Sequence, residues 1–429
     1  MLLGMEMQAP SAVKLGNSVT VAGPGAPLGA LAGVKVLDLS RVLAGPWCTQ
    51  TLADLGAEVI KIEAPQGDDT RSWGPPFLPG TGAADGLSAY FCCLNRNKQS
   101  VVVDLKNPDD LALIYRLAQW ADVVVQNYRT GTDVALGVDY PTLAALNPRL
   151  IYCSISGYGR TGPYAAQAGY DFIIQAETGL MAITGPVAGG PCKVGIPIAD
   201  ILTGQNAVSA IVAALYWRQQ SGQGQLLDLS LFDSQLAALV NVASAGLLTG
   251  AEPQRWGNAH PTIVPYQTFT GGDGVEFALA VGSQKLWQTF CAVVLGQPGL
   301  VDDPRFATNP DRVQHRAALV ELLQTQFNTQ PAAAWIAACD AAGIPAGPVN
   351  TVQQALAHPV TAARGLRVEV GGVPVVGSAL QLGATPVTYR LPPPRLGADT
   401  KSSKNSSIWP WISWKELISW ASKRPSSWC

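Results

Sequence analysis

Short apolar runs alternate with amphipathic stretches over the first part of the chain. The runs that predict strands lie at residues 34–39, 57–62, 101–105, 123–125 and 150–156. Helical spacing of apolar positions occurs between them, over residues 48–55 and 109–121. Because strands separated by helices of this length form right-handed βαβ units, the pattern predicts an α/β fold built on a parallel sheet.

The pattern changes in the second half. A long apolar stretch over residues 201–217 predicts a buried helix, and residues 226–231 and 232–243 predict a strand and a further helix. Between about 250 and 345, Pro and Gly become more frequent and the helical stretches shorten, to 285–295 and 312–326. We interpret this segment as a smaller second domain, and strand-like pieces follow over 346–400.

Both ends of the chain differ from the rest. Residues 1–30 are rich in Gly, Ala and Pro with a single lysine, which predicts a flexible leader without the marks of a signal or transit peptide. Residues 401–429 hold five of the twelve tryptophans and no glycine. A helix on a membrane surface is one interpretation of this tail and a shifted reading frame is another, so it is left out of the fold prediction.

Composition narrows the classes of function. Hydrophobic residues make up 48% of the 429 residues and charged residues 14%, with a net charge of −2. The apolar fraction excludes a mainly disordered chain, and the lack of a basic excess excludes nucleic-acid binding as the main role. No apolar run approaches the roughly 18 residues that cross a bilayer, so no membrane association is expected. So low a fraction of charged residues indicates that much of the protein surface is buried between subunits.

Common cofactor and metal motifs are missing from the sequence. The eight cysteines are scattered without a C-x-x-C, and the histidines are His260, His315 and His358, so no metal site is predicted. The cysteines are expected to pack as small hydrophobic side chains in a reducing compartment, which favours the cytoplasm. There is no G-x-G-x-x-G after a strand, no P-loop and no G-x-S-x-G.

A series of other motifs, in a definite order, indicates a family. They are RVLAGP at 41–46, DLGAEVIKIE at 54–63, GDDTR at 67–71, NRNKQS at 95–100, NYRTG at 127–131, SGYG at 156–159, GYD at 169–171, AD at 199–200 and SGQGQ at 221–225. Over residues 31–400 the chain resembles the type III CoA-transferase family, which includes formyl-CoA transferase and carnitine CoA-transferase. The stretches GDDTRSWGPPF and RWGNAH…VPYQTF are most similar to the succinate–hydroxymethylglutarate CoA-transferase branch.

The resemblance implies a fold and an assembly. Family members have a Rossmann-like large domain made from both ends of the chain, with a smaller α+β domain inserted between them, and form a homodimer of interlocked rings. The implied organisation is a large CoA-binding domain at 31–225, a linker and small domain at 226–345, and a return to the large domain at 346–400. An interlocked dimer would also account for the low surface charge.

Asp200 matches the family's catalytic aspartate. It precedes the apolar stretch that begins at residue 201, so its carboxylate could instead only cap a helix. The resemblance implies that Asp200 attacks an acyl-CoA thioester, giving an aspartyl anhydride and then an aspartyl–CoA thioester. CoA would pass from a donor thioester such as succinyl-CoA to a carboxylic acid, with a dicarboxylate as the best guess. The thioester is a substrate, and no tightly bound cofactor is expected.

The CoA contacts are carried over position by position. The residues that match them are Leu43, Ala44, Lys106, Asn127, Tyr128, Arg129, Gly169, Tyr170 and Asp171. Lys106 and Arg129 could bind phosphates, and Tyr128 could stack on adenine, although a lone Lys or Arg can equally be a solvated surface charge. Position 135, often basic in relatives, is Ala135 here, so the phosphate contacts are expected to be redistributed.

A loop around residue 257 matches one that covers the active site in formyl-CoA transferase. Trp256, Gly257 and His260 are the candidate substrate residues there. Trp256 could wall the acyl pocket or lie in the core, and His260 could bind a substrate carboxylate or be only a polar loop residue.

Two other functions compete with CoA transfer. An α-methylacyl-CoA racemase shares the fold, but such racemases use a histidine where this chain has Tyr170. Because the tyrosine pKa lies near 10, racemisation is disfavoured. A non-catalytic CoA-binding protein is the second alternative, and the presence of Asp200 argues against it.

Overall fold

The chain forms two compact units. The computed structural model describes residues 29–400, so the leader expected at 1–30 and the tail expected at 401–429 lie almost wholly outside the described residues. Within them, the first unit comprises residues 29–178, 195–240 and 359–400. The second comprises residues 179–194 and 241–358.

A six-stranded sheet is the centre of the first unit, with the strand order β3-β2-β1-β4-β5-β6. The strands are β1 (Lys35–Asp38), β2 (Glu58–Glu63), β3 (Lys98–Val102), β4 (Val123–Gln126), β5 (Ile151–Ser156) and β6 (Gln225–Ser230). Every neighbouring pair is parallel, which confirms the predicted α/β fold with a parallel sheet. The order is that of a Rossmann-like sheet, whose connections reverse direction between β1 and β4.

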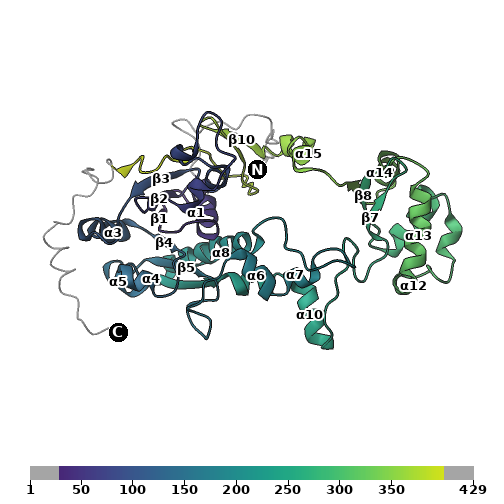
Figure 1. Ribbon diagram of the computed structural model, residues 1–429, viewed down its shortest axis with the longest axis horizontal. Helices are drawn as coiled ribbons and strands as arrows, with labels where there is room; N and C mark the ends of the chain where they lie inside the picture. The colour runs from purple at the N-terminus through teal and green to yellow at the C-terminus, as the bar shows by residue number, and fades with distance from the viewer. Residues whose placement is uncertain (1–28, 401–429) are drawn as a thin grey trace, which may run out of the picture. The chain divides into compact units, whose positions relative to one another are not determined.

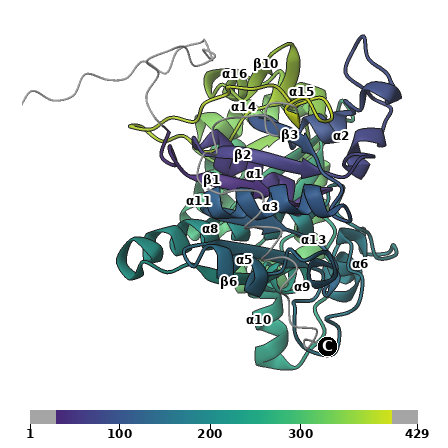
Figure 2. The same ribbon diagram turned by 90° about the vertical axis from the view of Figure 1, so that its left-hand side faces the viewer.

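Helices cover both faces of this sheet (Figures 1 and 2). On one face, α1 (Ala44–Asp54) and α8 (Ile198–Ser221) pack on Val36 and its neighbours. On the other, α3 (Pro108–Trp120) and α5 (Tyr140–Leu146) pack on Leu37 and its neighbours. Because successive side chains of a strand point to opposite faces and both faces are buried, the strands are continuous apolar runs in the sequence.

The close packing of α1 against α8 requires a glycine. A Cβ at Gly204 of α8 would lie 2.6 Å from the carbonyl oxygen of Ala44, so only glycine lets the two helices approach this closely. By length and composition α8 could cross a membrane, which the predicted apolar runs did not suggest. That property is weak evidence for a span, because the core helix of a packed domain shares it, and Ala207, Ile211 and Ala214 of α8 are buried in the first unit.

Several predicted helices have different bounds. The helix expected over 48–55 begins at Ala44, because Pro46 is tolerated in a first turn. The helix expected over 312–326 is divided at His315 into α12 (Asn309–Gln314) and α13 (Arg316–Phe327), and a capping box at Thr308 starts the first of them. The helix expected over 232–243 is likewise two, α9 (Leu231–Ala237) and α10 (Val240–Thr249).

Hydrogen bonds attach the C-terminal segment of the first unit to the N-terminal half of that unit. The hairpin of β10 (Arg367–Val370) and β11 (Val373–Val376) is antiparallel. The side-chain amide of Asn97 donates to the Thr388 carbonyl at 2.7 Å, and the Arg390 guanidinium donates to the carbonyls of Ala53 and Ala57. The remaining helices of this unit are α2 (Ala89–Cys92), α4 (Thr132–Leu136), α6 (Asp171–Glu177) and α16 (Pro359–Ala363).

The second unit is an α+β structure with an antiparallel sheet of β7 (Tyr266–Thr270), β8 (Glu276–Ala280) and β9 (Ala346–Pro348). Its core gathers Phe269, Phe277 and Trp335 around Phe327. Its other helices are α7 (Leu180–Ile183), α11 (Gln284–Thr289), α14 (Ala332–Ala341) and α15 (Val352–Leu356). The bounds of this unit differ from the predicted linker and small domain at 226–345, because β6 pairs along its length with β5 and therefore belongs to the first unit.

Candidate functional site

A cavity of about 120 Å³ lies at the carboxyl ends of the central strands. It is lined by Arg41, Val42, Ala44, Asn127, Tyr128, Arg129, Thr130, Ile155, Ser156, Gly157, Gln167, Ala168, Gly169, Tyr170, Asp200 and Leu231. The first three follow β1 and the next four follow β4, so the cavity opens where the strand order reverses. Ligands of open parallel sheets bind at this position.

The structure brings together most of the residues that the sequence predicted. Those that line the cavity are Ala44, Asn127, Tyr128, Arg129, Gly169, Tyr170 and Asp200. Leu43 and Asp171 adjoin lining residues in the chain, whereas Lys106 is exposed after β3 and does not line the cavity. Trp256, Gly257 and His260 belong to the second unit.

Asp200 is the third residue of α8 and does not cap it. Pro197 occupies the N-cap position. Asp171 holds this helix start instead, because its Oδ1 accepts from the Ala199 amide at 2.7 Å while its Oδ2 accepts from the Gln175 side chain at 2.7 Å. The alternative that Asp200 is merely an N-cap is therefore wrong. A carboxylate in the first turn still benefits from the positive end of the helix dipole.

The environment of Asp200 disfavours its negative charge. Burial, followed by the nearby charge of Asp171, raises the pKa of Asp200 to about 7. A half-buried carboxyl that lines a cavity and has its pKa raised toward neutral pH is characteristic of a reactive group. Asp171 thus has two effects, since it orders the backbone before Asp200 and makes the Asp200 carboxylate more basic.

A pH profile tests this arrangement. If ionised Asp200 is the reactive form, kcat/KM should rise with pH and reach half its plateau near pH 7. In Asp171→Asn the rising limb should move to lower pH, because the neighbouring negative charge is gone while an amide oxygen can still accept from Ala199. An unchanged limb in this variant would show that Asp171 does not set the pKa of Asp200.

Tyr90 of α2 does not line the cavity, but it lies near enough to Asp200 to feel its charge, which the sequence did not indicate. Burial, followed by the charge of Asp200, raises the pKa of the Tyr90 phenol, so its O–H stays protonated beside the two carboxyl groups. The Tyr90 and Trp73 rings pack edge to face, with their centroids 5.2 Å apart. Only the tertiary structure brings α2 toward Asp200, and no local pattern in the sequence could have shown it.

In the second unit, Arg316 organises the loop that carries the candidate substrate residues. Its guanidinium lies over the Trp256 ring at 4.8 Å and donates to the carbonyls of His260 and Pro261, each at 2.9 Å. Trp256 is half-buried against this cation rather than in the core. The Nδ1 atom of His260 accepts from the Thr262 amide at 3.1 Å, so one ring nitrogen is already engaged. Within residues 29–400 no group of three or more His, Cys, Asp or Glu could share a metal ion.

Comparisons with known proteins agree with the motifs. The family model described as CoA-transferase family III matches residues 31–400. The chain is 44% identical to a succinate–glutarate CoA-transferase of Agrobacterium fabrum, over 86% of this chain and 93% of that one. It is 42% identical to a succinyl-CoA:glutarate CoA-transferase of Mus musculus, over 86% and 85%. The crystal structure of a CAIB/BAIF family protein from Brucella suis is similar with a TM-score of 0.79 and 42% identity, over 88% of this chain and 99% of that one.

Proposed function

Because the chain belongs to CoA-transferase family III, and so is an enzyme that transfers CoA between acids, we propose that it moves CoA from succinyl-CoA to a dicarboxylic acid such as glutarate, with Asp200 as nucleophile. The relatives named for succinate and glutarate support these substrates. The observation that carries the mechanism is the Asp200 carboxyl, which lines the cavity at the strand reversal and titrates near pH 7.

The proposed reaction uses one carboxylate and the substrates. Asp200 attacks the donor thioester carbonyl, forming a mixed anhydride and expelling CoA thiolate. The thiolate attacks the aspartyl carbonyl, which gives an aspartyl–CoA thioester and releases the donor acid. The acceptor carboxylate then attacks this thioester, forming a second anhydride and CoA thiolate. Attack of the thiolate on the acceptor's acyl carbonyl gives the new acyl-CoA and restores Asp200.

Other residues of the first unit would bind and orient the reactants. The neutral Tyr90 O–H is suited to donate to an oxygen that gains negative charge. Arg41 and Arg129 supply positive charge at the cavity, which suits the phosphates of CoA or a substrate carboxylate. The anhydride must be kept from water, so the cavity has to be covered during turnover.

Activity against a panel of acids tests the proposal. With succinyl-CoA as donor, we expect the acyl-CoA product to form fastest from dicarboxylates of about glutarate length, and more slowly from monocarboxylates. Transfer to other acids but not to dicarboxylates would overturn the substrate assignment. Exchange of the α-proton of a 2-methylacyl-CoA without transfer would support the racemase alternative, and CoA binding without either reaction would support a non-catalytic protein.

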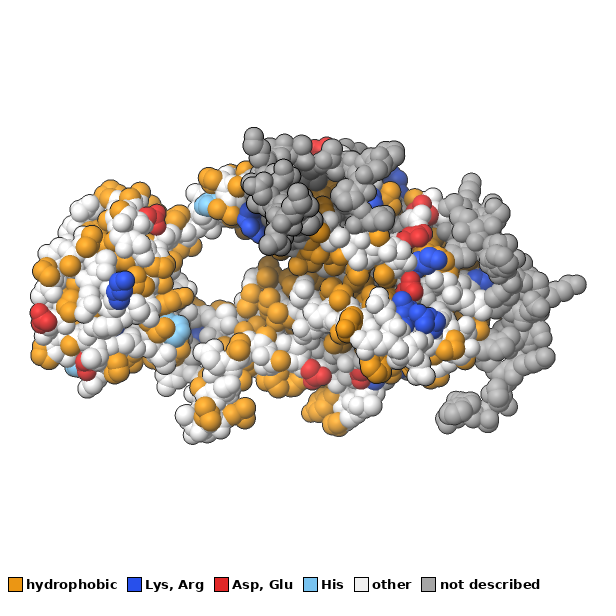
Figure 3. Space-filling view, turned by 180° about the vertical axis from the view of Figure 1, so that it is seen from behind, with side chains coloured by type: hydrophobic (Ala, Val, Ile, Leu, Met, Phe, Trp, Pro, Cys, Tyr) orange, Lys and Arg blue, Asp and Glu red, His pale blue; other side chains and the backbone are white. Residues whose placement is uncertain are grey.

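We propose that the enzyme is a homodimer with interlocked chains. Exposed apolar side chains support an interface, since Tyr216 and Trp217 of α8 are 67% and 53% exposed and Leu247 and Leu248 of α10 are 88% and 87% exposed. The face in Figure 3 carries many hydrophobic and few charged side chains. Large apolar side chains that are exposed in each unit often mark protein interfaces.

Dilution distinguishes an interlocked dimer from a loose one. Interlocked chains cannot separate without unfolding, so light scattering should find a dimer even at nanomolar concentration. A folded monomer under these conditions would contradict the interlocked arrangement, although not the chemistry.

We further propose that the enzyme acts in the cytoplasm, with no tightly bound cofactor and with neither nucleic acid nor membrane as partner. The seven cysteines within residues 29–400 are free thiols, which supports a reducing compartment. The proposed reaction balances with a carboxylate and CoA alone, so it requires no further group.

A further inference from the structure

The turn between β1 and α1 is held in an unfavourable conformation. Val42 has a φ of +67°, in the left-handed region that β-branched residues rarely adopt. Such a conformation is strained and persists only where the surroundings impose it. Val42 and Ala44, on either side of Leu43, both line the cavity that contains Asp200. The direction in which the chain enters α1 therefore shapes the wall of the site.

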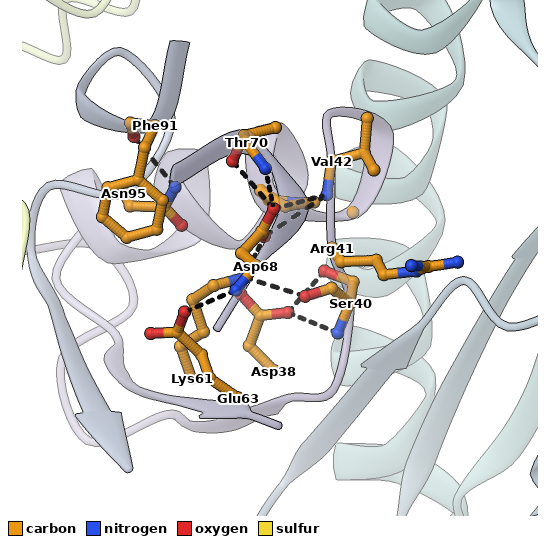
Figure 4. Close-up of polar contacts among 12 residues, drawn as sticks. Asp38, Ser40, Arg41, Val42, Lys61, Glu63, Asp68, Thr70, Phe91 and Asn95 are labelled. Atoms are coloured by element: carbon orange, nitrogen blue, oxygen red, sulfur yellow. Dashed lines mark hydrogen bonds and ion pairs between the residues drawn. The ribbon is translucent and has the colours of Figure 1, made fainter. Parts of the chain in front are cut away.

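Asp68 holds the amide of this turn (Figure 4). Its two carboxylate oxygens share the Val42 N–H in a three-centre hydrogen bond, with both N–O distances at 3.3 Å. Side-chain hydrogen bonds fix the Asp68 carboxylate in turn. The Thr70 hydroxyl donates to Oδ1 at 2.8 Å and Lys61 Nζ donates to Oδ2 at 2.9 Å.

The same lysine holds the other side of the turn. Lys61 Nζ also donates to the Ser40 carbonyl at 2.8 Å, and the Lys61 side chain is fully buried. Burial would raise the pKa of Asp68, but the charge and hydrogen bond of Lys61 lower it below its usual value, so Asp68 is ionised. A buried charge with this many partners has a well-defined position.

Neighbouring residues of the turn are held by other groups, such as Asp38, to which the Ser40 amide donates at 3.0 Å. No side chain caps the helix at Leu43. Asn127 holds the residue that precedes Val42, Arg41, whose amide donates to Asn127 Oδ1 at 2.9 Å and whose carbonyl accepts from Asn127 Nδ2 at 2.7 Å. Asn127 fixes the turn before Val42 and Asp68 fixes it at Val42.

We propose that Asp68 is a positioning residue for CoA transfer, because it imposes the left-handed turn at Val42 that keeps the β1–α1 wall in register with Asp200. The proposal rests on the proposed function of Asp200. Asp68 does not line the cavity, and it acts through the Val42 amide. Its loss should misplace the acyl group rather than remove a reacting atom.

Rescue by glycine tests this role. In Asp68→Asn a single amide oxygen remains, for which Lys61, Thr70 and the Val42 N–H compete, so the hold on Val42 is weakened. We expect kcat to fall about 100-fold, the loss expected for a displacement of about 1 Å, while calorimetry should show little change in the affinity for CoA. In the double variant Asp68→Asn/Val42→Gly, kcat should recover by about tenfold or more, because glycine adopts a positive φ without steric cost. If Asp68 only compensates the charge of Lys61 or only stabilises the fold, the Val42→Gly substitution should give no such recovery.

Amide hydrogen exchange reports on the turn at Val42 independently of enzyme activity. The peptide that contains Val42 should exchange faster in Asp68→Asn. It should not do so in Asp54→Asn, which removes another buried carboxylate from the far end of α1 and should lower the melting temperature without changing kcat. If Asp68→Asn does not fold, Thr70→Val loosens the same carboxylate and should show the same rescue by Val42→Gly.

The outcomes separate this proposal from the function itself. An inactive wild-type enzyme would contradict the proposed function, and exchange at Val42 would then decide only whether Asp68 holds the turn. An active wild type with unchanged kcat in Asp68→Asn, no rescue by glycine, or unchanged exchange at Val42 would overturn the positioning role.

Discussion

Asp200→Asn is expected to abolish CoA transfer while leaving the protein folded. The substitution removes the nucleophile, and such losses are on the order of 10⁴-fold or more in kcat. Stability should not decline at pH 8. Because burial and Asp171 raise the pKa of Asp200 to about 7, the stability from this group is full below about pH 4 and is lost as pH rises through 7. An uncharged amide avoids that loss, so the melting temperature at pH 8 should stay the same or increase.

Chemical capture identifies the reacting carboxyl directly. After incubation with an acyl-CoA, hydroxylamine should convert Asp200 to a hydroxamate and borohydride should reduce it, with the label on the peptide that contains Asp200. Asp171→Ala is the matched control, since it removes the neighbouring carboxylate and its bond to Ala199 but leaves the nucleophile. It should slow the reaction and still give the adduct. Label on Asp171, or near-native transfer in Asp200→Asn, would contradict the assignment.

The sheet could be predicted where burial made the strands uniformly apolar. β1, β2, β4 and β5 lie within a residue or two of the expected runs. β3 differs, since it begins at Lys98 and contains Ser100, polar residues that no apolar run includes. Both are buried because Lys98 pairs with Asp38 and the Ser100 hydroxyl donates to Glu63. The pairing that makes it possible to bury these polar side chains depends on partners that are distant in the sequence.

The residues of the site could be predicted only where they belong to motifs of the family. Asp200 lies in the first turn of α8, whereas Asn127 and Gly169 lie in two loops, and the resemblance, not the periodicity, brought the three together. Arg41 and Val42 were overlooked although they lie in the same motif as Ala44, and Tyr90 had no signal at all. Lys106 lies outside the lining of this cavity, so its contact with CoA stays a prediction. Loop positions depend on tertiary contacts that local patterns do not contain.

The attachment of the C-terminal segment depends on a buried ion pair at the end of α1. Arg96 donates to the Asp54 carboxylate, and the two side chains are only 4% and 1% exposed. Another nitrogen of the Arg96 guanidinium donates to the Val376 carbonyl at 3.0 Å. The same carboxylate accepts from Asn97 at 2.8 Å, and Asn97 in turn holds Thr388. Residues almost 300 positions apart in the sequence thus share one polar cluster.

Arg96→Ala should therefore lower the free energy of unfolding of the first unit by about 3–5 kcal/mol, the usual cost of leaving one partner of a buried pair uncompensated. Urea unfolding at pH 7 would measure this. Arg395→Ala is the control, because Arg395 also joins the C-terminal segment to an N-terminal carboxylate, that of Asp85, but is 61% exposed. Its loss should have a much smaller effect, because solvent screens an exposed ion pair. If the two substitutions have equal effects, burial of the Arg96–Asp54 pair contributes little. The C-terminal segment would then be attached to the first unit mainly by packing of the apolar hairpin.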